Sequence, residues 1–291
     1  MEVSNISGIV AIAGGGNHSL AIKNDGTAWA WGFNIYGQLG DGTTTDSNVP
    51  VQVSNLSGVI AIAGSGAYSL ALKNDGTVWA WGFNNYGQLG NGSNVDSNIP
   101  VQVSGLSGIT SIAGAFTHSM ALKNDGTVWT WGYNASGELG DGTNTDSNIP
   151  VQVSTLSGVV TIAGGGTHSL AIKNDGTVWA WGYNLYGELG NGNNTDSNIP
   201  VQVTGLCQAV TGVNEMKGSI SVSVYPNPST GKFQISIAEP VQLKVTDVLG
   251  KLVHSELTST GTIDLDHLQN GIYFLNLTVN GEKKIKKLIL W

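Results

Sequence analysis

The chain has 291 residues, of which 40% are hydrophobic, and its 12 basic and 20 acidic residues give a net charge of -8 at pH 7. This composition is sufficient to bury a core, and the length allows two domains, so a disordered chain is excluded. Every basic residue is a lysine. Without the bidentate contacts of arginine, an acidic chain is a poor ligand for nucleic acid, which we exclude as a partner.

Charge is spread unevenly along the chain. Up to Thr204 there are 4 lysines against 13 acidic residues, a net of -9, and the remainder has 8 lysines against 7 acidic residues, a net of +1. The single cysteine, Cys207, excludes a disulfide within one chain and a cysteine-based metal site. No apolar stretch approaches the ~20 residues that cross a bilayer, so we expect no membrane span.

A block of fifty residues occurs four times in tandem. The segment Lys23–Gly32 returns nearly unchanged at Lys73–Gly82, Lys123–Gly132 and Lys173–Gly182. Self-similarity at such a period predicts a solenoid or a propeller. We place the copies at about 3–52, 53–102, 103–152 and 153–203, within a first domain of residues 1–205.

Each copy is expected to form four short strands. The Asp75-Gly76 pair predicts a tight hairpin, and Pro100 confines the last strand to a sheet edge. Trp79 and Trp81 fall on one face of their strand, with small Val78 and Ala80 on the other. Such a sheet is a wedge of the propeller-blade kind. In the second copy the strands are Val59–Ala63, Tyr68–Leu72, Val78–Trp81 and Asn98–Val103.

Four blades leave a question of closure. At the sevenfold angle of about 51° each, four blades sweep only about 205°, although closed four-bladed propellers exist. We therefore predict an all-β fold with a partial, four-repeat β-propeller arc, whose open edges allow edge-to-edge self-association. Val3–Gly8 matches Val53–Gly58, but the Ile-Pro strand that precedes Val53 has no counterpart before Val3. We expect further repeats and an export signal upstream.

One end of the blades is expected to bind a ligand. Alternating strand direction puts the corner after the first strand and the long loop after the third strand at the same end. The four copies differ mainly at this end, whereas the opposite hairpins are identical. Variation at one end of a constant scaffold is typical of a binding surface. The candidate ligand-binding residues are Asn17, Tyr36, Tyr68, Tyr86, Phe116, Thr117 and Tyr186.

These copies share a longer pattern: a His-Ser-x-Ala strand, an Asp-Gly turn, a Trp-Gly-x-Asn segment and a Gly-Gln-Leu-Gly loop. The pattern resembles the repeat of the regulator of chromosome condensation family from about Val3 to Val203. The resemblance implies a propeller, usually of seven blades, that binds partners through its end faces. The inserted wedge and basic tails needed for nucleotide exchange have no counterpart here, so we do not expect that activity.

The last part of the chain has a different composition. After an expected linker at 206–218, residues 219–291 predict a small β-sandwich. Its motifs resemble the C-terminal sorting domain of type IX secretion in Bacteroidetes, which implies passage through the outer membrane to the cell surface or the extracellular space. The motif residues are Pro226, Asn227, Pro228, Gly231, Asp247, Gly250, Lys251, Gly271 and Tyr273. The strands are expected at Val222–Val224, Lys232–Ile237, Gln242–Asp247, Lys251–Leu257, Thr262–Leu265, Ile272–Val279 and Lys284–Leu290.

We find no catalytic, metal or cofactor site in the sequence. His18, His118 and His168 recur once per copy, which spaces them around a ring rather than onto one ion. Asp141–Asn148 offers alternate oxygen ligands as a calcium loop does, but it lacks the later glutamate and reads as turns. Glu138 and Glu188 are replaced by glutamine in the other copies, which is against a hydrolase pair.

We therefore expect a non-catalytic, secreted binding or adhesion module at the cell surface, which needs no cofactor and whose partner is a protein or a glycan. Two alternatives remain open at this stage. In the first, the propeller inhibits a secreted enzyme such as a β-lactamase, because it resembles bacterial propellers that block β-lactamases through such loops. In the second, the chain is the tail of a larger secreted enzyme whose catalytic domain lies upstream.

Overall fold

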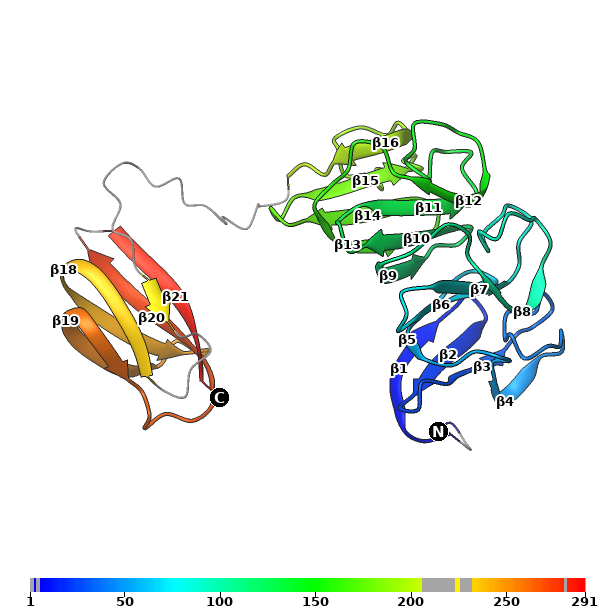
Figure 1. Ribbon diagram of the computed structural model, residues 1–291. Helices are drawn as coiled ribbons and strands as arrows, with labels where there is room; N and C mark the ends of the chain where they lie inside the picture. The colour runs from blue at the N-terminus through cyan, green and yellow to red at the C-terminus, as the bar shows by residue number, and fades with distance from the viewer. Residues whose placement is uncertain (1–2, 4–5, 206–222, 226–231, 280–281, 291) are drawn as a thin grey trace. The chain divides into compact units, whose positions relative to one another are not determined.

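The computed structural model describes residues 3, 6–205, 223–225, 232–279 and 282–290. The expected linker at 206–218 and the motif residues Pro226, Asn227, Pro228 and Gly231 lie outside these ranges. The chain forms two compact units, Met1–Thr211 and Gly212–Trp291, which are described separately. Every regular element in the described ranges is a β-strand, which confirms the predicted all-β class (Figure 1).

Each repeat forms one antiparallel sheet of four strands in chain order, called a blade below. The strands lie within one residue of those predicted for the second copy. Blade 1 consists of β1 (Ile9–Gly14), β2 (His18–Lys23), β3 (Ala28–Gly32) and β4 (Ser47–Gln52); blade 2 of β5 (Val59–Gly64), β6 (Tyr68–Lys73), β7 (Val78–Gly82) and β8 (Ser97–Gln102). Blade 3 consists of β9 (Ile109–Gly114), β10 (His118–Lys123), β11 (Val128–Gly132) and β12 (Ser147–Gln152); blade 4 of β13 (Val159–Gly164), β14 (His168–Lys173), β15 (Val178–Gly182) and β16 (Ser197–Gln202).

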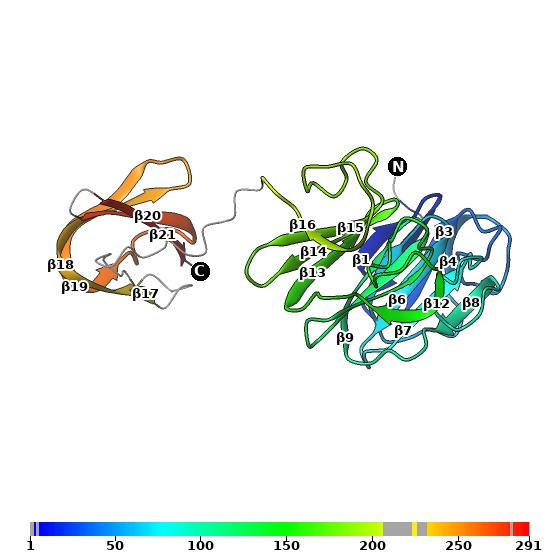
Figure 2. The ribbon, with the colours of Figure 1, turned by 90° about the horizontal axis from the view of Figure 1, so that it is seen from above.

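The blades stack face to face in an arc and do not close into a ring (Figures 1 and 2). On one side of blade 2, Leu70 and Ala80 belong to the same buried cluster as Trp131 of blade 3. On the other side, Ala71 and Trp81 belong to a cluster formed with blade 1. We call these the forward and back faces of a blade. A small alanine on one face and a large tryptophan on the other give the wedge that the sequence predicted.

At each interface between neighbouring blades, one main-chain carbonyl oxygen accepts two hydrogen bonds from side chains of the next blade. The Gln38 carbonyl of blade 1 accepts from Ser69 Oγ and from Trp81 Nε1 of blade 2, both at 2.9 Å. The Gln88 and Glu138 carbonyls accept the same pair of donors at the next two interfaces. Because the indole is fully buried, its N–H requires this acceptor.

The recurring histidines extend these links. His18 Nε2 lies 2.9 Å from Ser69 Oγ, whose own proton is donated to the Gln38 carbonyl, so the neutral ring must be the donor. His118 makes the same contact with Ser169 at 2.7 Å. Burial lowers the pKa of His18 to about 4 and that of His118 to about 3, which keeps both rings uncharged at neutral pH.

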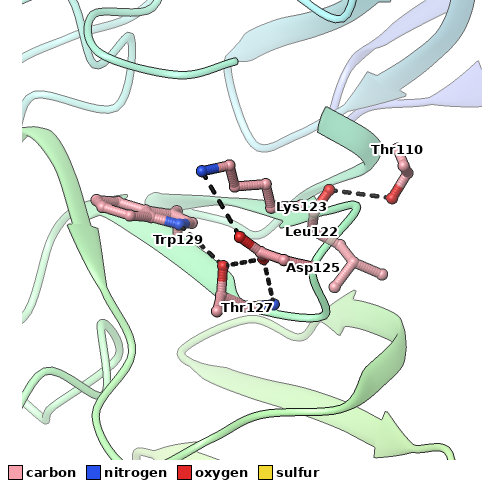
Figure 3. A network of polar contacts seen from close by, with 6 residues as sticks. All are labelled: Thr110, Leu122, Lys123, Asp125, Thr127 and Trp129. Atoms are coloured by element: carbon pink, nitrogen blue, oxygen red, sulfur yellow. Dashed lines mark hydrogen bonds and ion pairs between the residues drawn. The ribbon is translucent and has the colours of Figure 1, made fainter. Parts of the chain in front are cut away.

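The hairpin opposite the variable loops is held by a fixed polar network, shown for blade 3 in Figure 3. Asp125 Oδ1 accepts from the Thr127 main-chain nitrogen at 3.0 Å and from its hydroxyl at 2.6 Å, and Lys123 Nζ lies 3.7 Å from Asp125 Oδ2. Thr127 Oγ1 in turn accepts from Trp129 Nε1. The side-chain hydrogen bond from Thr127 is the largest cause that lowers the pKa of Asp125. The other three blades repeat these contacts. At this end of each blade, the polar side chains of the hairpin therefore bond to one another.

The second unit is a curved five-stranded sheet in which β18 pairs with β17, β19 and β20 and β20 pairs with β21. Two pairs of short strands predicted from the sequence are instead single long strands, because β18 and β19 stay paired across a register shift between Ser236 and Val241. Such a bulge bends a strand. Phe233 and Ile263 therefore share one buried core with Leu243 and Leu275, as in a sandwich. The strands are β17 (Ser223–Tyr225), β18 (Lys232–Asp247), β19 (Leu252–Asp264), β20 (Gly271–Val279) and β21 (Glu282–Leu290).

The interface hydrogen bonds lead to a stability prediction. Trp131→Phe removes the indole donor of the blade 2–blade 3 interface and leaves the Gln88 carbonyl with one donor fewer, so we expect a loss of about 2 kcal/mol in the free energy of unfolding. Trp129→Phe on the same strand is the control, because its hydrogen bond stays within one hairpin, and we expect a loss below about 1 kcal/mol. Urea titration of both variants measures the difference, and equal losses would contradict the role given to the carbonyl.

Candidate functional site

A hollow of about 260 Å³ lies at the variable-loop end of blades 1 to 3. Its wall combines corner residues between the first two strands of a blade with loop residues after the third strand. The corners and the long loops therefore do lie at one end of the propeller. The corner residues are Gly16, Asn17, Gly66, Ala67, Phe116 and Thr117, and the loop residues are Phe33, Tyr36 and Phe83.

A row of five aromatic rings borders the hollow and continues past it. Neighbouring rings meet edge to face, with centroid separations of 6.3, 4.9, 6.1 and 5.0 Å along the row. This geometry is the favoured one for aromatic pairs and fixes each ring by its neighbours. In order, the aromatic row is Phe33, Tyr36, Phe83, Tyr86 and Tyr133.

The predicted ligand-binding residues lie in four places: the hollow, the aromatic row beside it, an exposed loop of blade 4 and a buried blade interface. Asn17, Tyr36, Phe116 and Thr117 line the hollow. Tyr86 stands in the aromatic row beside it with its side chain 37% exposed. Phe116 is the most exposed ring of the wall at 63%.

Tyr186 lies apart from this group. Its ring is 82% exposed and contacts Tyr183 of the same blade at 6.4 Å. In blade 3 the corresponding position is Ser136, which has no ring to bridge Tyr133 and Tyr183. The serine ends the aromatic row before blade 4.

The prediction for Tyr68 needs a correction. Its ring is fully buried in the cluster between blades 2 and 3, where the hydroxyl donates to the His118 carbonyl and lies 3.0 Å from Ser119 Oγ, whose own proton is donated to the Gln88 carbonyl. Burial raises the pKa of Tyr68 to about 12. Tyr68 replaces the histidine of the other blades as an interface link, so it is not available to a ligand.

Buried asparagines hold the long loops. Asn34 is fully buried, accepts from the Leu39 nitrogen through Oδ1, and donates through Nδ2 to the carbonyls of Thr43 and Thr45. Its own nitrogen donates to Asp46 Oδ1 at 2.7 Å. Asn84, Asn134 and Asn184 repeat this arrangement. The loops that carry the rings are thus built from fixed polar contacts rather than from loose chain.

Polar contacts of the same kind engage the carboxylates of Asp141–Asn148, the segment whose sequence is similar to a calcium loop. Asp141 Oδ1 accepts from the nitrogen and the hydroxyl of Thr143, and Asp146 Oδ1 accepts from the Asn134 nitrogen. In the part of the chain that the structure describes, no three histidine, cysteine, aspartate or glutamate side chains converge on a point where an ion could bind.

Residues 38, 88 and 138 connect the loop end to the blade interface. While the Gln38 carbonyl joins two blades, its side-chain Oε1 accepts from the Tyr36 nitrogen at 3.1 Å. Gln88 does the same for Tyr86 at 2.9 Å, and Glu138 Oε2 for Ser136 at 2.9 Å. Burial raises the pKa of Glu138 to about 7, since a charged carboxylate has poor solvation there.

Phe33, Phe83 and Tyr133 were missed by sequence reasoning. The predicted binding residues are positions that differ between copies, whereas the residue after Trp-Gly is aromatic in all four. A constant aromatic position reads as a core residue. The available signal was that this position follows a glycine at a strand end, where the chain enters a solvent-exposed loop.

In the second unit the structure brings two sorting-motif residues together. Asp247 at the end of β18 is the register partner of Tyr273 on β20. Asp247 Oδ1 accepts from the nitrogens of Leu249 and Lys251, both at 2.9 Å, and Gly250 adopts a φ of +83° in this turn. Gly271 opens β20 and pairs with Leu290. These residues shape a turn and a strand pair.

An arc of wedge-shaped blades with its variable loops at one end defines the first unit as a repeat propeller. The family model described as the regulator of chromosome condensation (RCC1) repeat matches residues 25–72, 75–122, 125–172 and 175–214, and a second model of that description matches 9–38, 59–88, 109–138 and 159–188. The chain belongs to this repeat family. Propellers of this family are typically binding folds rather than catalysts.

The model described as the secretion system C-terminal sorting domain matches residues 223–291. This tail belongs to type IX secretion and directs the protein to the cell surface or the extracellular space. In the described residues, no helix is of the length and apolarity needed to cross a membrane.

Individual relatives cover parts of the chain. It is 39% identical over 70 residues to the ulvan lyase NLR42 of Nonlabens ulvanivorans, which is 22% of this chain and 13% of the lyase. It is 40% identical over 52 residues to the ultraviolet-B receptor UVR8 of Arabidopsis thaliana, which is 18% of this chain and 12% of the receptor. The chain thus aligns with about an eighth of each relative's length.

Solved structures share the fold. Human WBSCR16 matches with a TM-score of 0.62 at 23% identity, over 88% of this chain and 67% of that one. Prp20p of Saccharomyces cerevisiae matches with a TM-score of 0.60 at 21% identity, over 92% of this chain and 72% of that one.

Buried Glu138 leads to a prediction about pH. Its pKa is raised in the folded state, so the stability it contributes is present at acidic pH and is lost as the pH rises through about 7. Glu138→Gln, which copies blades 1 and 2, should raise the Tm by at least about 3 °C at pH 8 and leave it unchanged at pH 4.5.

Glu188→Gln is the matched control, because it removes the same charge at the corresponding, half-buried position of blade 4. Thermal melts at both pH values make the comparison. An equal gain for Glu138→Gln at the two pH values would show that the charge is not the cause.

Proposed function

We propose that this protein is a non-catalytic binding module, exported by its type IX sorting tail, that binds a protein partner through the variable-loop end of its propeller. The observation that carries the proposal is the hollow bordered by the aromatic row and Phe116. Tyrosine is among the residues that supply much of the binding energy at protein interfaces, and phenylalanine is enriched in the buried core of such interfaces. Phe116, which is 63% exposed, lies in the wall of the hollow with rings of the row, and a contiguous exposed apolar patch is typical of an interaction site.

A protein is favoured over a glycan for two reasons. The rings of the row pack edge to face against each other, so part of the flat surface on which a sugar ring would stack is already in contact with a neighbouring ring. The hollow, at about 260 Å³, is also smaller than typical pockets for small ligands and suits a side chain inserted from a partner surface. Prp20p, which shares the fold, is described with binding properties towards Gsp1p and histones, which are proteins.

The acidic charge of the propeller adds a preference for the partner. With a net charge of -9 up to Thr204, the unit attracts surfaces rich in lysine and arginine and repels acidic polysaccharides. A secreted enzyme with a basic rim around its active site fits this description, and for that reason we retain inhibition as the second candidate function.

The loop-end proposal is tested with point variants of the full chain. Immobilised wild type should capture a protein from the envelope fraction of the producing bacterium, and Phe116→Ala should reduce that capture at least about tenfold without lowering the Tm, because the ring is exposed and fills no core. Tyr186→Ala is the control, since its exposed ring lies outside the hollow.

Pretreatment of the fraction separates the two partner classes. Proteinase should abolish the capture, and periodate, which oxidises sugars, should leave it intact. Capture that survives proteinase but not periodate would replace the protein partner with a glycan. Capture that Phe116→Ala leaves unchanged would reject the hollow as the contact surface.

A further inference from the structure

The variable-loop end of the propeller carries nearly all of its net charge. Up to Thr204, each of the four lysines pairs with the aspartate of its own Asp-Gly hairpin, at 3.4 to 4.0 Å. Of the nine other acidic residues in this part of the chain, eight lie in the long loops between the third and fourth strands of the blades, and five of these belong to blades 3 and 4. A cation is therefore attracted most strongly to the loop end of those two blades. The eight residues are Asp41, Asp46, Asp96, Glu138, Asp141, Asp146, Glu188 and Asp196.

The aromatic row is interrupted between the same two blades. In the two preceding pairs of blades, a tyrosine of one long loop contacts the first ring of the next loop, at 4.9 and 5.0 Å. The corresponding contact with Tyr183 is missing, because blade 3 has Ala135-Ser136 where the other blades have a larger residue followed by a tyrosine. We call the place of this missing ring, between Ser136 and Tyr183, the loop gap.

A buried carboxyl group lies beneath the loop gap. Glu138 is fully buried, and its Oε2 accepts from the main-chain nitrogen of Ser136 at 2.9 Å, so the carboxyl group is directed at the gap. Its Oε1 is also buried and has no hydrogen-bond partner among the described residues. A charge in the protein interior is screened far less than a charge in water, so it acts strongly on a cation placed nearby.

The blade interface does not require a glutamate at this position. Gln38 and Gln88 make the same hydrogen bonds through their main-chain and side-chain oxygens. Burial raises the pKa of Glu138 to about 7, so its charge is kept at a cost in stability that a glutamine would avoid. Blade 3 thus combines the loss of a ring with the gain of a buried carboxyl group, and both changes favour a cationic ligand.

Two tyrosines and two further carboxylates lie around the loop gap. Asp146 accepts from the nitrogen of the residue after Tyr133 at 2.8 Å, and Asp196 from that of the residue after Tyr183 at 2.7 Å. After burial, which is the main cause, the charges of both aspartates raise the pKa of Glu138, so the three carboxyl groups lie near one another. Aromatic rings beside carboxylates suit a guanidinium, which is planar, stacks on rings and donates to carboxylates.

We propose that the loop gap binds an arginine side chain of the partner protein, with its guanidinium beside Tyr183 and Ser136 and above Glu138. Among the described residues, the carboxylates do not converge on a point where a metal ion could bind, whereas a guanidinium spreads its charge and donors over a plane. Arginine is favoured over lysine, because the ammonium group is compact and more strongly hydrated. This inference rests on the proposed binding role of the loop end, but its site lies outside the hollow of blades 1 to 3.

A labelled peptide tests the loop gap on the full chain. The probe is a short fluorescent peptide of alternating arginine and glycine, and anisotropy follows its binding at pH 8 and about 50 mM salt, where screening is weak. Ser136→Tyr restores the ring that the other blades carry, so it should raise the dissociation constant at least about tenfold by filling the gap. Its circular dichroism should be that of wild type, because the three other long loops accommodate a tyrosine at this position.

A second pair of variants tests the buried charge. Glu138→Gln should raise the dissociation constant at least about fivefold, because it removes the charge beneath the gap and keeps the hydrogen bonds seen for Gln38 and Gln88. Asp41→Asn is the matched control: it removes one charge from the long loop of blade 1 and copies the asparagines of blades 2 and 4, so we expect a change below about twofold. The corresponding lysine peptide should bind at least about threefold more weakly than the arginine peptide.

Four results would overturn the inference. These are no binding of the arginine peptide, binding to Ser136→Tyr as tight as to wild type, equal losses for Glu138→Gln and Asp41→Asn, or a lysine peptide that binds as tightly as the arginine peptide.

Phe116→Ala separates this inference from the proposed function. It should leave peptide binding unchanged, because Phe116 lines the hollow and not the loop gap. Failure of the peptide experiments with Phe116-dependent capture would reject the loop gap alone. Peptide binding that depends on Ser136 and Glu138, together with capture that Phe116→Ala leaves intact, would support the loop gap and reject the hollow alone.

Discussion

The propeller depends on a hydrogen-bonded carbonyl at each blade interface. One blade exposes apolar side chains on both faces, and a single four-stranded sheet cannot bury them. The adjacent blade provides the missing cover, and the Gln38, Gln88 and Glu138 carbonyls set its position by accepting a serine and an indole donor from it. Each buried indole N–H has a single acceptor. These directional hydrogen bonds fix the register between blades, which apolar contacts alone would not do.

This interface also explains why the two ends of a blade differ. At the Asp-Gly end, the Asp125–Thr127 network closes the hairpin with its own residues, and all four blades keep it unchanged. At the other end, the chain leaves the third strand for a long loop whose base is fixed by buried Asn34 and its equivalents. Between these fixed points, positions 35 and 36 and their counterparts vary between the copies, and all of them are exposed except half-buried Ser136. Within one sheet, the constant stabilising network therefore lies at the Asp-Gly end, and the positions that vary between copies lie at the opposite end.

The blades could be predicted closely because their signals are local: period-two alternation, an Asp-Gly turn and a proline on the edge strand. Tyr68 shows where local signals stop. It adjoins variable loop residues in the sequence, yet contacts with blade 3, some fifty residues away, decide that it is buried. The aromatic row could not be predicted either, since the 4.9 Å contact of Tyr36 with Phe83 depends on the rotation between blades. In the tail, a bulge joins two predicted strands into one, and bulges have no clear signature in a single sequence.

The geometry of the candidate site follows from the interface rather than from the loop alone. The main-chain oxygen of Gln38 accepts hydrogen bonds from the side chains of Trp81 and Ser69 in the next blade. Its side-chain oxygen accepts a hydrogen bond from the main-chain nitrogen of Tyr36. The ring of Tyr36 then meets Phe83 of that next blade. One residue therefore sets both the angle between two blades and the place of a ring in the row. A change that loosens the interface must also displace the rings, so the binding end and the stability of the array depend on the same few hydrogen bonds.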